Sequence, residues 1–247
     1  HGEIDVRYIG QVNKQAPLWH QIRQRPMLIG GSIGHFQITA GTLGAIVVHQ
    51  KTQRQVILSN NHVLANEDRA KIGDAILQPG KYDGGNLAAD RCGQLLDFVK
   101  LKSQANLVDA AIATIDPDVA FDHVTLTGLG KLAGLRTDPI EPGDQVRKIG
   151  RTTGLTKGIV TAIEVDDVAV GYGIGTLSFD RQIEIEGAGS DPFSKGGDSG
   201  SLIVDSENRG CALLFAGGDT GGTNGKGLTF ANDLHLVLQQ LQLTLAV

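Results

Sequence analysis

The chain has 247 residues, which is enough for one large domain or two modest ones. Hydrophobic residues make up 40% and charged residues 20%, which excludes a disordered chain, and the 34 glycines follow no collagen period. The formal net charge is −5 and the Lys and Arg residues are scattered, so we expect neither nucleic acid nor a membrane as a partner. So many glycines predict tight turns, and a soluble, turn-rich β protein is the first expectation.

The first residue of the sequence and its two cysteines give limited information about processing and compartment. The sequence begins at His1 rather than Met, so we expect that residues upstream have been removed. Cys92 and Cys211 form no C-x-x-C pattern, and two buried thiols are favoured over the alternative, a single disulfide. The compartment stays open, with the cytoplasm slightly favoured over secretion.

Residues 1–30 are predicted to form an N-terminal arm, with a short helix between Gln11 and Arg25 that ends at Pro26. Residues 31–116 then carry short apolar or alternating runs between Gly, Asn and Asp residues, a spacing typical of antiparallel strands. We expect strands at residues 36–39, 44–49, 55–58, 75–78, 94–99 and 110–115. The Pro-containing stretch 117–142 is predicted to be a linker.

A second β series is predicted over residues 143–231, with strands at residues 145–149, 158–165, 177–185, 201–204, 211–215 and 228–230. Residues 232–247 are predicted to form a helix after an Asn cap, because Leu234, Val237 and Leu238 share one face at helical spacing. Two β series of similar length predict an all-β protein of two small barrels or sandwiches.

The strongest candidate for chemistry is Ser199, which lies in the segment Gly196-Gly197-Asp198-Ser199-Gly200-Ser201 directly before a predicted strand. Gly197 and Gly200 permit a sharp turn, so the amides of Gly197 and Ser199 can point at one oxygen and form an oxyanion hole. A Ser hydroxyl is a weak nucleophile without a base and an orienting acid. The alternative is a glycine-rich turn with a solvated Ser.

His62 and Asp109 are the candidates for that base and acid. His62 follows a predicted strand at a strand-to-helix turn, and Asp109 is a lone acid within an apolar, strand-like run. A buried carboxylate needs a partner because an unpaired charge in the core costs several kcal/mol. The alternatives are a helix-capping or core role for His62 and a surface salt bridge for Asp109.

These segments, S-N-N-H-V-L around His62, L-V-D-A-A-I-A around Asp109 and G-G-D-S-G-S around Ser199, resemble in sequence and order the motifs of the trypsin/chymotrypsin-like serine peptidases. The G-x-T-T-G segment at residues 150–154 is similar to that of bacterial members such as streptogrisins and α-lytic proteinase. The resemblance covers about Ile33 to Leu243. It implies two antiparallel six-stranded β-barrels, trypsin-like, with a triad in the cleft between them.

The resemblance also implies roles for supporting residues. Asp198 would pair with a cation, and Lys148, just ahead of the G-x-T-T-G segment, is expected to supply it without any cut before Ile29. Phe193 would line the floor of the primary specificity pocket, which argues against a preference for Lys or Arg and favours small or medium apolar side chains. Phe215, Ala216 and Gly217 would pair with the substrate backbone.

The sequence therefore predicts a serine endopeptidase that acts on polypeptides by acyl transfer, with no cofactor and no metal. The alternative is a catalytically weak peptide-binding or scaffold protein of the same fold. An α/β-hydrolase is disfavoured because Ser201 replaces the second Gly of its G-x-S-x-G motif, and a P-loop because Gly227 follows Lys226. Oligomerisation through the N-terminal arm is a further expectation.

Overall fold

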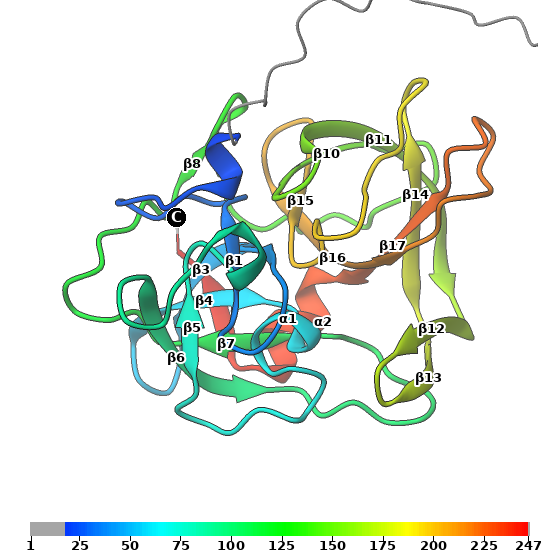
Figure 1. Cartoon of the computed structure of the whole chain (residues 1–247). Helices are drawn as coiled ribbons and strands as arrows, with labels where there is room; N and C mark the ends of the chain where they lie inside the picture. The colour runs from blue at the N-terminus through cyan, green and yellow to red at the C-terminus, as the bar shows by residue number, and fades with distance from the viewer. Residues whose placement is uncertain (1–17, 247) are drawn as a thin grey trace, which may run out of the picture.

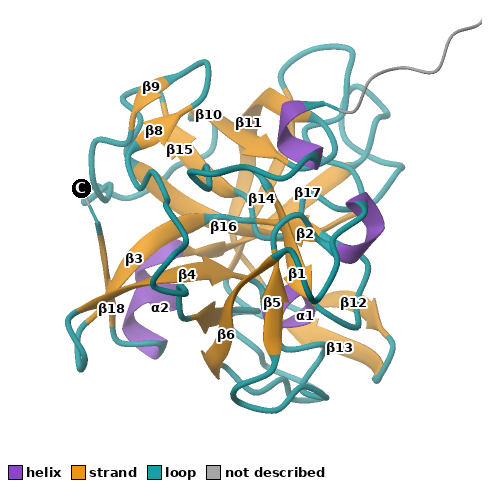
Figure 2. Ribbon diagram, turned by 60° about the vertical axis from the view of Figure 1, so that its left-hand side comes forward, coloured by secondary structure: helices purple, strands orange, loops and turns teal. Residues whose placement is uncertain are grey.

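The computed structural model describes residues 18–246, and its main elements are two β-sheets. The first sheet is formed by the first half of the chain together with one strand from its C-terminal end, the second sheet is formed by the second half, and the two lie against each other (Figure 1; Figure 2). This arrangement confirms the all-β class. The predicted helix from Gln11 lies partly outside the described residues, and the described part has one short 3-10 helix, η1 (Trp19–Gln21).

The first sheet is curled and open, and it has eight strands where we expected a closed barrel of six. Its strand order is β18-β3-β4-β7-β6-β5-β1-β2. The strands are β1 (Ser32–His35), β2 (Gly41–Thr42), β3 (Ala45–His49), β4 (Arg54–Ser59), β5 (Ala75–Leu77), β6 (Arg91–Phe98), β7 (Ala111–Ala113) and β18 (Leu243–Leu245). The predicted strand at residues 36–39 is instead a turn, closed by the bond from Ile38 N–H to the His35 carbonyl.

The second sheet is the closed barrel of six strands that we expected, in the order β10-β11-β14-β17-β16-β15. Its strands are β10 (Gln145–Gly150), β11 (Gly154–Val165), β14 (Gln182–Gly187), β15 (Leu202–Asp205), β16 (Gly210–Gly217) and β17 (Leu228–Asp233). The predicted strand at residues 177–185 is divided in two, because Arg181 has φ of 60° and turns the chain.

A separate hairpin leaves this barrel between β11 and β14. It pairs β12 (Val168–Tyr172), which the sequence analysis did not predict, with β13 (Gly175–Phe179). Figure 1 shows the hairpin projecting from the barrel beside the first sheet. The predicted linker at residues 117–142 holds only a small hairpin of β8 (Thr125–Leu126) and β9 (Gly130–Lys131).

The C-terminal helix is shorter than predicted. Helix α2 (Leu234–Gln240) begins after Asp233, whose side chain accepts a hydrogen bond from His235 N–H at 2.7 Å and so replaces the expected Asn cap. The chain then forms β18, which pairs antiparallel with β3 of the first sheet. The prediction of helix to residue 247 was therefore wrong beyond Gln240, because the last apolar residues join a sheet edge.

The described part of the predicted arm packs on the body of the protein. Met27 is fully buried, and its N–H donates to the Ala120 carbonyl at 2.8 Å. His20 Nδ1 lies 2.6 Å from the Arg151 carbonyl oxygen, and Gly30 N–H donates to Leu43 O. Residues 18–30 therefore contact both halves of the chain.

One apolar cluster joins the two halves beneath this segment. It consists mostly of residues of the first sheet and α2, and it includes Ile149, Leu202, Val204 and Leu213 of the barrel. A second cluster fills the barrel itself. The shared cluster fixes one sheet against the other, and so it fixes the loops that meet between them.

Both cysteines are buried and free, as the favoured interpretation predicted. Burial raises the pKa of Cys92 and of Cys211 to about 12, so neither thiol is a reactive nucleophile. Among residues 18–246, no helix has the length and apolar character needed to cross a membrane.

Candidate active site

His62 lies in the short helix α1 (Asn61–Leu64), which directly follows strand β4 of the first sheet. Asn60 holds this turn in place, because its side-chain amide donates to the Asp109 carbonyl at 2.7 Å instead of capping α1. Asn61 is buried as well, and its amide donates to the Val99 carbonyl at 2.8 Å. The two Asn residues thus anchor the turn, and the imidazole of His62 projects into the space between the sheets.

Asp109 directly faces His62. Its side chain is fully buried, its Oδ2 lies 2.5 Å from His62 Nδ1, and its Oδ1 accepts from His62 N–H at 3.2 Å. The barrel holds the backbone of Asp109, since Asp109 N–H donates to Asn232 Oδ1 at 2.9 Å and Asn232 is bonded to Gln182. An acid that lies just before β7 of the first sheet is therefore positioned by residues of β14 and β17 of the second.

The electrostatics of the pair favour a charged acid beside a basic imidazole. Burial disfavours the imidazolium, but the charge and the hydrogen bond of Asp109 outweigh it, so the pKa of His62 lies above its ordinary value. Burial also opposes ionisation of Asp109, but His62 and a hydrogen bond from Tyr172 hold the pKa of this carboxyl below its usual range. Asp109 is thus an acceptor, and His62 Nδ1 must be the donor.

Ser199 lies in the loop between β14 and β15, in a sharp turn that needs glycine on both sides. Gly197 has φ of 95°, and a Cβ there would lie 2.5 Å from Thr152 Oγ1. Gly200 has φ of 92°, and a Cβ there would lie 2.1 Å from Ser59 Oγ. Both positions combine left-handed backbone with no space for a side chain, which accounts for glycine at each.

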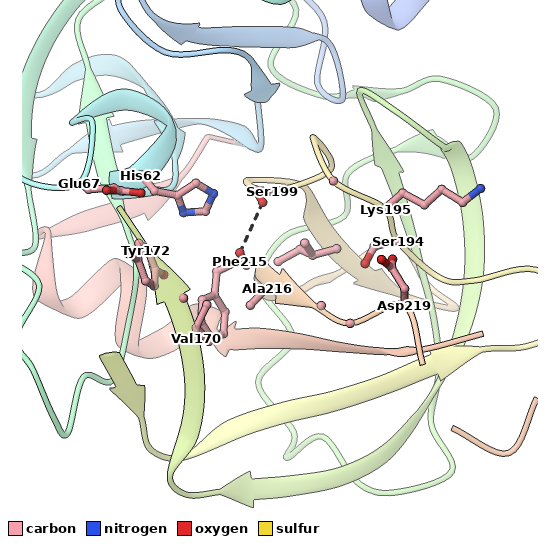
Figure 3. A pocket seen from close by; sticks show the side chains of 15 residues that line it. His62, Glu67, Val170, Tyr172, Ser194, Lys195, Ser199, Phe215, Ala216 and Asp219 are labelled. Atoms are coloured by element: carbon pink, nitrogen blue, oxygen red, sulfur yellow. Dashed lines mark hydrogen bonds between the residues drawn. The ribbon is translucent and has the colours of Figure 1, made fainter. Parts of the chain in front are cut away.

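The Ser199 hydroxyl faces the imidazole of His62 across the pocket and donates to the Phe215 carbonyl at 3.4 Å (Figure 3). Between these two described side chains there is no hydrogen bond in this structure. Contacts of this kind are often long in a site without substrate and shorten when the reacting complex forms.

The direction of the Gly197 N–H is set by the Gly196 carbonyl, which belongs to the same peptide plane. Thr152 Oγ1 donates to the Gly196 carbonyl at 2.7 Å, and Thr42 Oγ1 donates to the Gly197 carbonyl at 3.0 Å. Because a trans peptide is planar, fixing the Gly196 carbonyl on the Thr152 side turns the Gly197 N–H to the opposite side. Thr152 therefore sets the direction of this amide.

The Ser199 amide is held in the same way. The Asp198 carbonyl accepts from Ser201 Oγ at 2.6 Å and from Ser201 N–H at 3.0 Å, which fixes the peptide plane that ends in the Ser199 N–H. Neither this N–H nor that of Gly197 donates to another described residue. Two fixed, unengaged amide donors are what an oxyanion hole requires.

Asp198 points away from the pocket and into the barrel. Its Oδ1 accepts from the N–H groups of Thr152 and Thr153 at 2.8 and 3.1 Å, and its Oδ2 accepts from Thr153 Oγ1 at 2.6 Å. Lys148 Nζ lies 3.3 Å from the same Oδ2, and both side chains are fully buried. The ammonium also donates to Thr153 Oγ1, so the pair belongs to one network under the loop.

A pocket opens beside Ser199, and five of the residues singled out from the sequence line it: His62, Ser199, Phe215, Ala216 and Gly217. Its lining is His62, Glu67, Val170, Gly171, Tyr172, Ser194, Lys195, Gly196, Ser199, Leu214, Phe215, Ala216, Gly217, Gly218 and Asp219. Figure 3 shows Glu67, Tyr172 and Val170 on the His62 side, and Ser194, Lys195 and Asp219 on the other.

The structure does not bring Phe193 into this pocket. Its ring is 1% exposed, packs within the core of the barrel and has Lys148 Nζ 5.7 Å from its centre. The neighbouring Ser194 lines the pocket instead, with its Oγ 2.7 Å from Thr229 Oγ1. The bulk of Phe193 thus does not set the pocket's depth, because its ring lies in the core of the barrel and not in the pocket lining.

Thr42, Glu67, Thr152 and Tyr172 are among the residues at the site that were not predicted to act there. The threonines occur in turns and short strands, where sequence alone predicts only a structural role. Tyr172 follows Val168 and Val170 at strand spacing, which could have indicated β12, but its bond to Asp109 spans 63 positions of the chain. Among the described residues, no cluster of His, Cys, Asp and Glu is suited to hold a metal.

Comparison with solved structures identifies the fold. The chain is similar to the chymotrypsin of Cellulomonas bogoriensis, at 18% identity and a TM-score of 0.60, over 89% of this chain and 98% of that one. It is similar to protease A of Thermobifida fusca, at 16% identity and a TM-score of 0.61, over 90% and 98%. It is also similar to the Nocardiopsis protease, at 17% identity and a TM-score of 0.63, over 90% and 99%.

No family model and no curated protein matches the sequence. At such low identities the structural similarity shows the fold, and this fold is trypsin-like, as the sequence motifs predicted. What the site does is a separate question, because one fold can carry different functions.

The loop geometry makes a testable prediction at Thr152. Replacing Thr152 with Val keeps the shape but removes the donor to the Gly196 carbonyl, so the Gly197 amide loses its fixed direction. For an acyl transfer that uses these amides as oxyanion donors, we expect kcat to fall about tenfold, less than the loss of a whole oxyanion donor would cause. Steady-state kinetics would measure it, with Thr161→Val on β11 as the control, and an unchanged kcat would show that the Gly197 amide is aimed by other contacts.

Proposed function

We propose that this protein is a serine endopeptidase that cleaves polypeptides through an acyl-enzyme. One observation carries the proposal: the pocket joins the Ser199 hydroxyl to an imidazole that is bonded to a fully buried carboxylate, and the loop of Ser199 carries two unengaged amides. These are the nucleophile, the base with its orienting acid, and the oxyanion donors of acyl transfer. The trypsin-like fold supports the same assignment.

In this mechanism His62 Nε2 takes the proton of Ser199 as the hydroxyl attacks the peptide carbonyl. Nδ1 donates to the ionised Asp109, so Nε2 of the neutral ring is free to accept the proton. The imidazolium then returns the proton to the leaving amine, and Asp109 stabilises the charged ring. A water molecule repeats the sequence in the second half of the reaction and releases the acyl group.

The developing oxyanion would lie between the amides of Gly197 and Ser199. Their carbonyl partners are already held by Thr152 and by Ser201, so these donors need little reorganisation during the reaction. The buried pair of Lys148 and Asp198 supports this loop from below. We propose that this pair keeps the loop competent without cleavage before Ile29.

The substrate backbone is proposed to pair with the end of β16. The ladder from β15 to β16 ends at Leu213, whereas β16 continues to Gly217 with only β17 as a ladder neighbour. Residues 215–217 therefore present a strand edge beside Ser199, and an extended peptide can add to such an edge. Phe215, Ala216 and Gly217 would hold the residues that precede the scissile bond.

The direct test is a digest of a peptide library derived from a proteome, read by mass spectrometry. We expect new internal termini with the wild-type protein, which defines an endopeptidase and gives its side-chain preference. The control is the same digest with Ser199→Ala, which we expect to leave the peptides intact. Equal cleavage by both proteins would disprove the assignment.

A second candidate is a catalytically weak protein of the same fold that binds peptides or acts as a scaffold. The observation that favours it is the Ser199 hydroxyl, which donates to the Phe215 carbonyl and not to His62. Such a protein would bind peptides along β16 without cleaving them. A fluorophosphonate probe separates the two, because it reacts only with an activated serine.

The pKa of His62 determines the acid side of the pH profile. Since Asp109 holds this pKa above its ordinary value, the ring is protonated, and cannot accept a proton, at pH values where a free His is already neutral. We expect kcat/KM to fall with decreasing pH with a midpoint above about 6.5. Kinetics from pH 5 upward, with circular dichroism to confirm folding, would measure it, and a midpoint well below that value would contradict the account.

A further inference from the structure

We propose that Tyr172 is a positioning residue of this site: its hydroxyl, carried by the hairpin of β12 and β13, completes the hydrogen bonding of Asp109 and so sets the orientation and basicity of His62. This inference rests on the proposed function. It adds to the triad a fourth side chain, which comes from outside the closed barrel.

The contacts of the Asp109 carboxylate carry the inference. Tyr172 Oη donates to Asp109 Oδ2 at 2.6 Å, and the same oxygen lies 2.5 Å from His62 Nδ1. Among the described residues, His62 and Tyr172 are the two whose groups donate to this carboxylate. A fully buried carboxylate depends on such donors, so Tyr172 supplies a large share of its stabilisation.

The hairpin holds the tyrosine ring firmly. The ring stacks on Phe179 at 5.9 Å between centres, and Phe179 packs on Phe215 of the proposed substrate strand at 4.6 Å. The edge contact with the His62 ring is at 5.8 Å. At the turn, Gly173 N–H donates to Glu67 Oε1 at 3.0 Å, which ties the hairpin to the loop after α1.

Tyr172 stays a donor throughout the working pH range. Burial and the neighbouring charge of Asp109 raise the pKa of its phenol far above the ordinary value, so the hydroxyl keeps its proton. The groups facing His62 are Asp109, Tyr172 and Glu67; the charges of Asp109 and Glu67 raise its pKa directly, and Tyr172 acts on it through Asp109. Without the phenol donor, His62 is the residue that still donates to the Asp109 carboxylate. The negative charge then favours the imidazolium more strongly, so the pKa of His62 rises.

The same hairpin forms a wall of the pocket. Val170 and Gly171 line it together with Tyr172, and Figure 3 shows Val170 and Tyr172 on the side of the pocket next to His62. A peptide lying along Phe215 and Ala216 would therefore touch the element that holds the acid in place. Substrate contact and the geometry of the triad are coupled through one hairpin.

The test compares Tyr172→Phe with Tyr82→Phe. The first variant removes only the hydroxyl and keeps the ring stack, and the second removes a hydroxyl from a side chain that is 72% exposed. We expect Tyr172→Phe to lower kcat about tenfold with little change in KM, the cost of one hydrogen bond to a charged group. We also expect the acid midpoint of its pH profile to rise by about half a unit or more.

A measurement without substrate keeps this test independent of the proposed function. In the Ser199→Ala background, the imidazole pKa of His62 is measured by NMR of protein with labelled histidine, with and without Tyr172→Phe. A higher pKa in the Phe variant supports the role of Tyr172. An unchanged pKa, equal to that of Tyr82→Phe, overturns it. A wild-type protein that cleaves nothing would refute the proposed function and leave this comparison valid.

Discussion

Replacing Ser199 with Ala is expected to abolish peptide hydrolysis, with kcat reduced by about a millionfold. The triad acts as a unit, so loss of the nucleophile removes almost all of the rate enhancement that the base and acid provide. The fold should be unaffected, because the hydroxyl makes one long hydrogen bond, to the Phe215 carbonyl at 3.4 Å. Steady-state kinetics on a peptide found in the library digest would measure the loss.

The matched control for this variant is Ser206→Ala, since Ser206 is an exposed serine beyond the end of β15. We expect wild-type turnover in the control. A Ser199→Ala protein that retained even a hundredth of the wild-type kcat, with contaminating protease excluded, would mean that another residue is the nucleophile.

Replacing Lys148 with Met is expected to damage both stability and turnover. The change leaves Asp198 as an unpaired charge in a fully buried site, and breaking such a pair costs about 3–5 kcal/mol. The loop that carries Ser199 and its two amides rests on Asp198, so we expect kcat to fall at least about tenfold at temperatures where the variant is folded. Urea unfolding and steady-state kinetics would measure the two effects.

Two further variants separate the causes. Lys157→Met removes an exposed lysine from the adjacent strand β11, and it should change neither quantity. The double variant of Lys148→Met with Asp198→Asn leaves no unpaired charge, so we expect it to recover part of the lost stability. Unchanged turnover in Lys148→Met would contradict the role of this lysine and reopen the question of what supports the loop.

The parts of the fold that could be predicted are those with a local signal. Short apolar runs bounded by turn residues indicated most strands of the closed barrel, because each strand has an inner face that must be buried. Strand β18 carried no such signal. It is three residues long, and its pairing with β3 depends on a contact between opposite ends of the chain. The predicted helix was therefore extended over it.

In the candidate site too, the residues with a local sequence signal could be predicted and those that depend on distant contacts could not. The segments around His62, Asp109 and Ser199 are each distinctive within a few residues, so the sequence alone could single them out. Tyr172 could not be found in this way, because its role comes from a hairpin that places it against an acid in another sheet. The family resemblance placed Phe193 at the pocket floor, but a resemblance in sequence does not say which way a side chain faces, and this ring lies in the core.

Labelling with a fluorophosphonate probe tests the central claim most directly, since it asks whether Ser199 is activated by His62. We predict that the wild-type protein gains one probe mass, that the modified peptide contains Ser199, and that Ser199→Ala and His62→Ala gain none. Absence of labelling in the folded wild-type protein, or equal labelling of His62→Ala, would contradict the account and favour a peptide-binding protein with a trypsin-like fold.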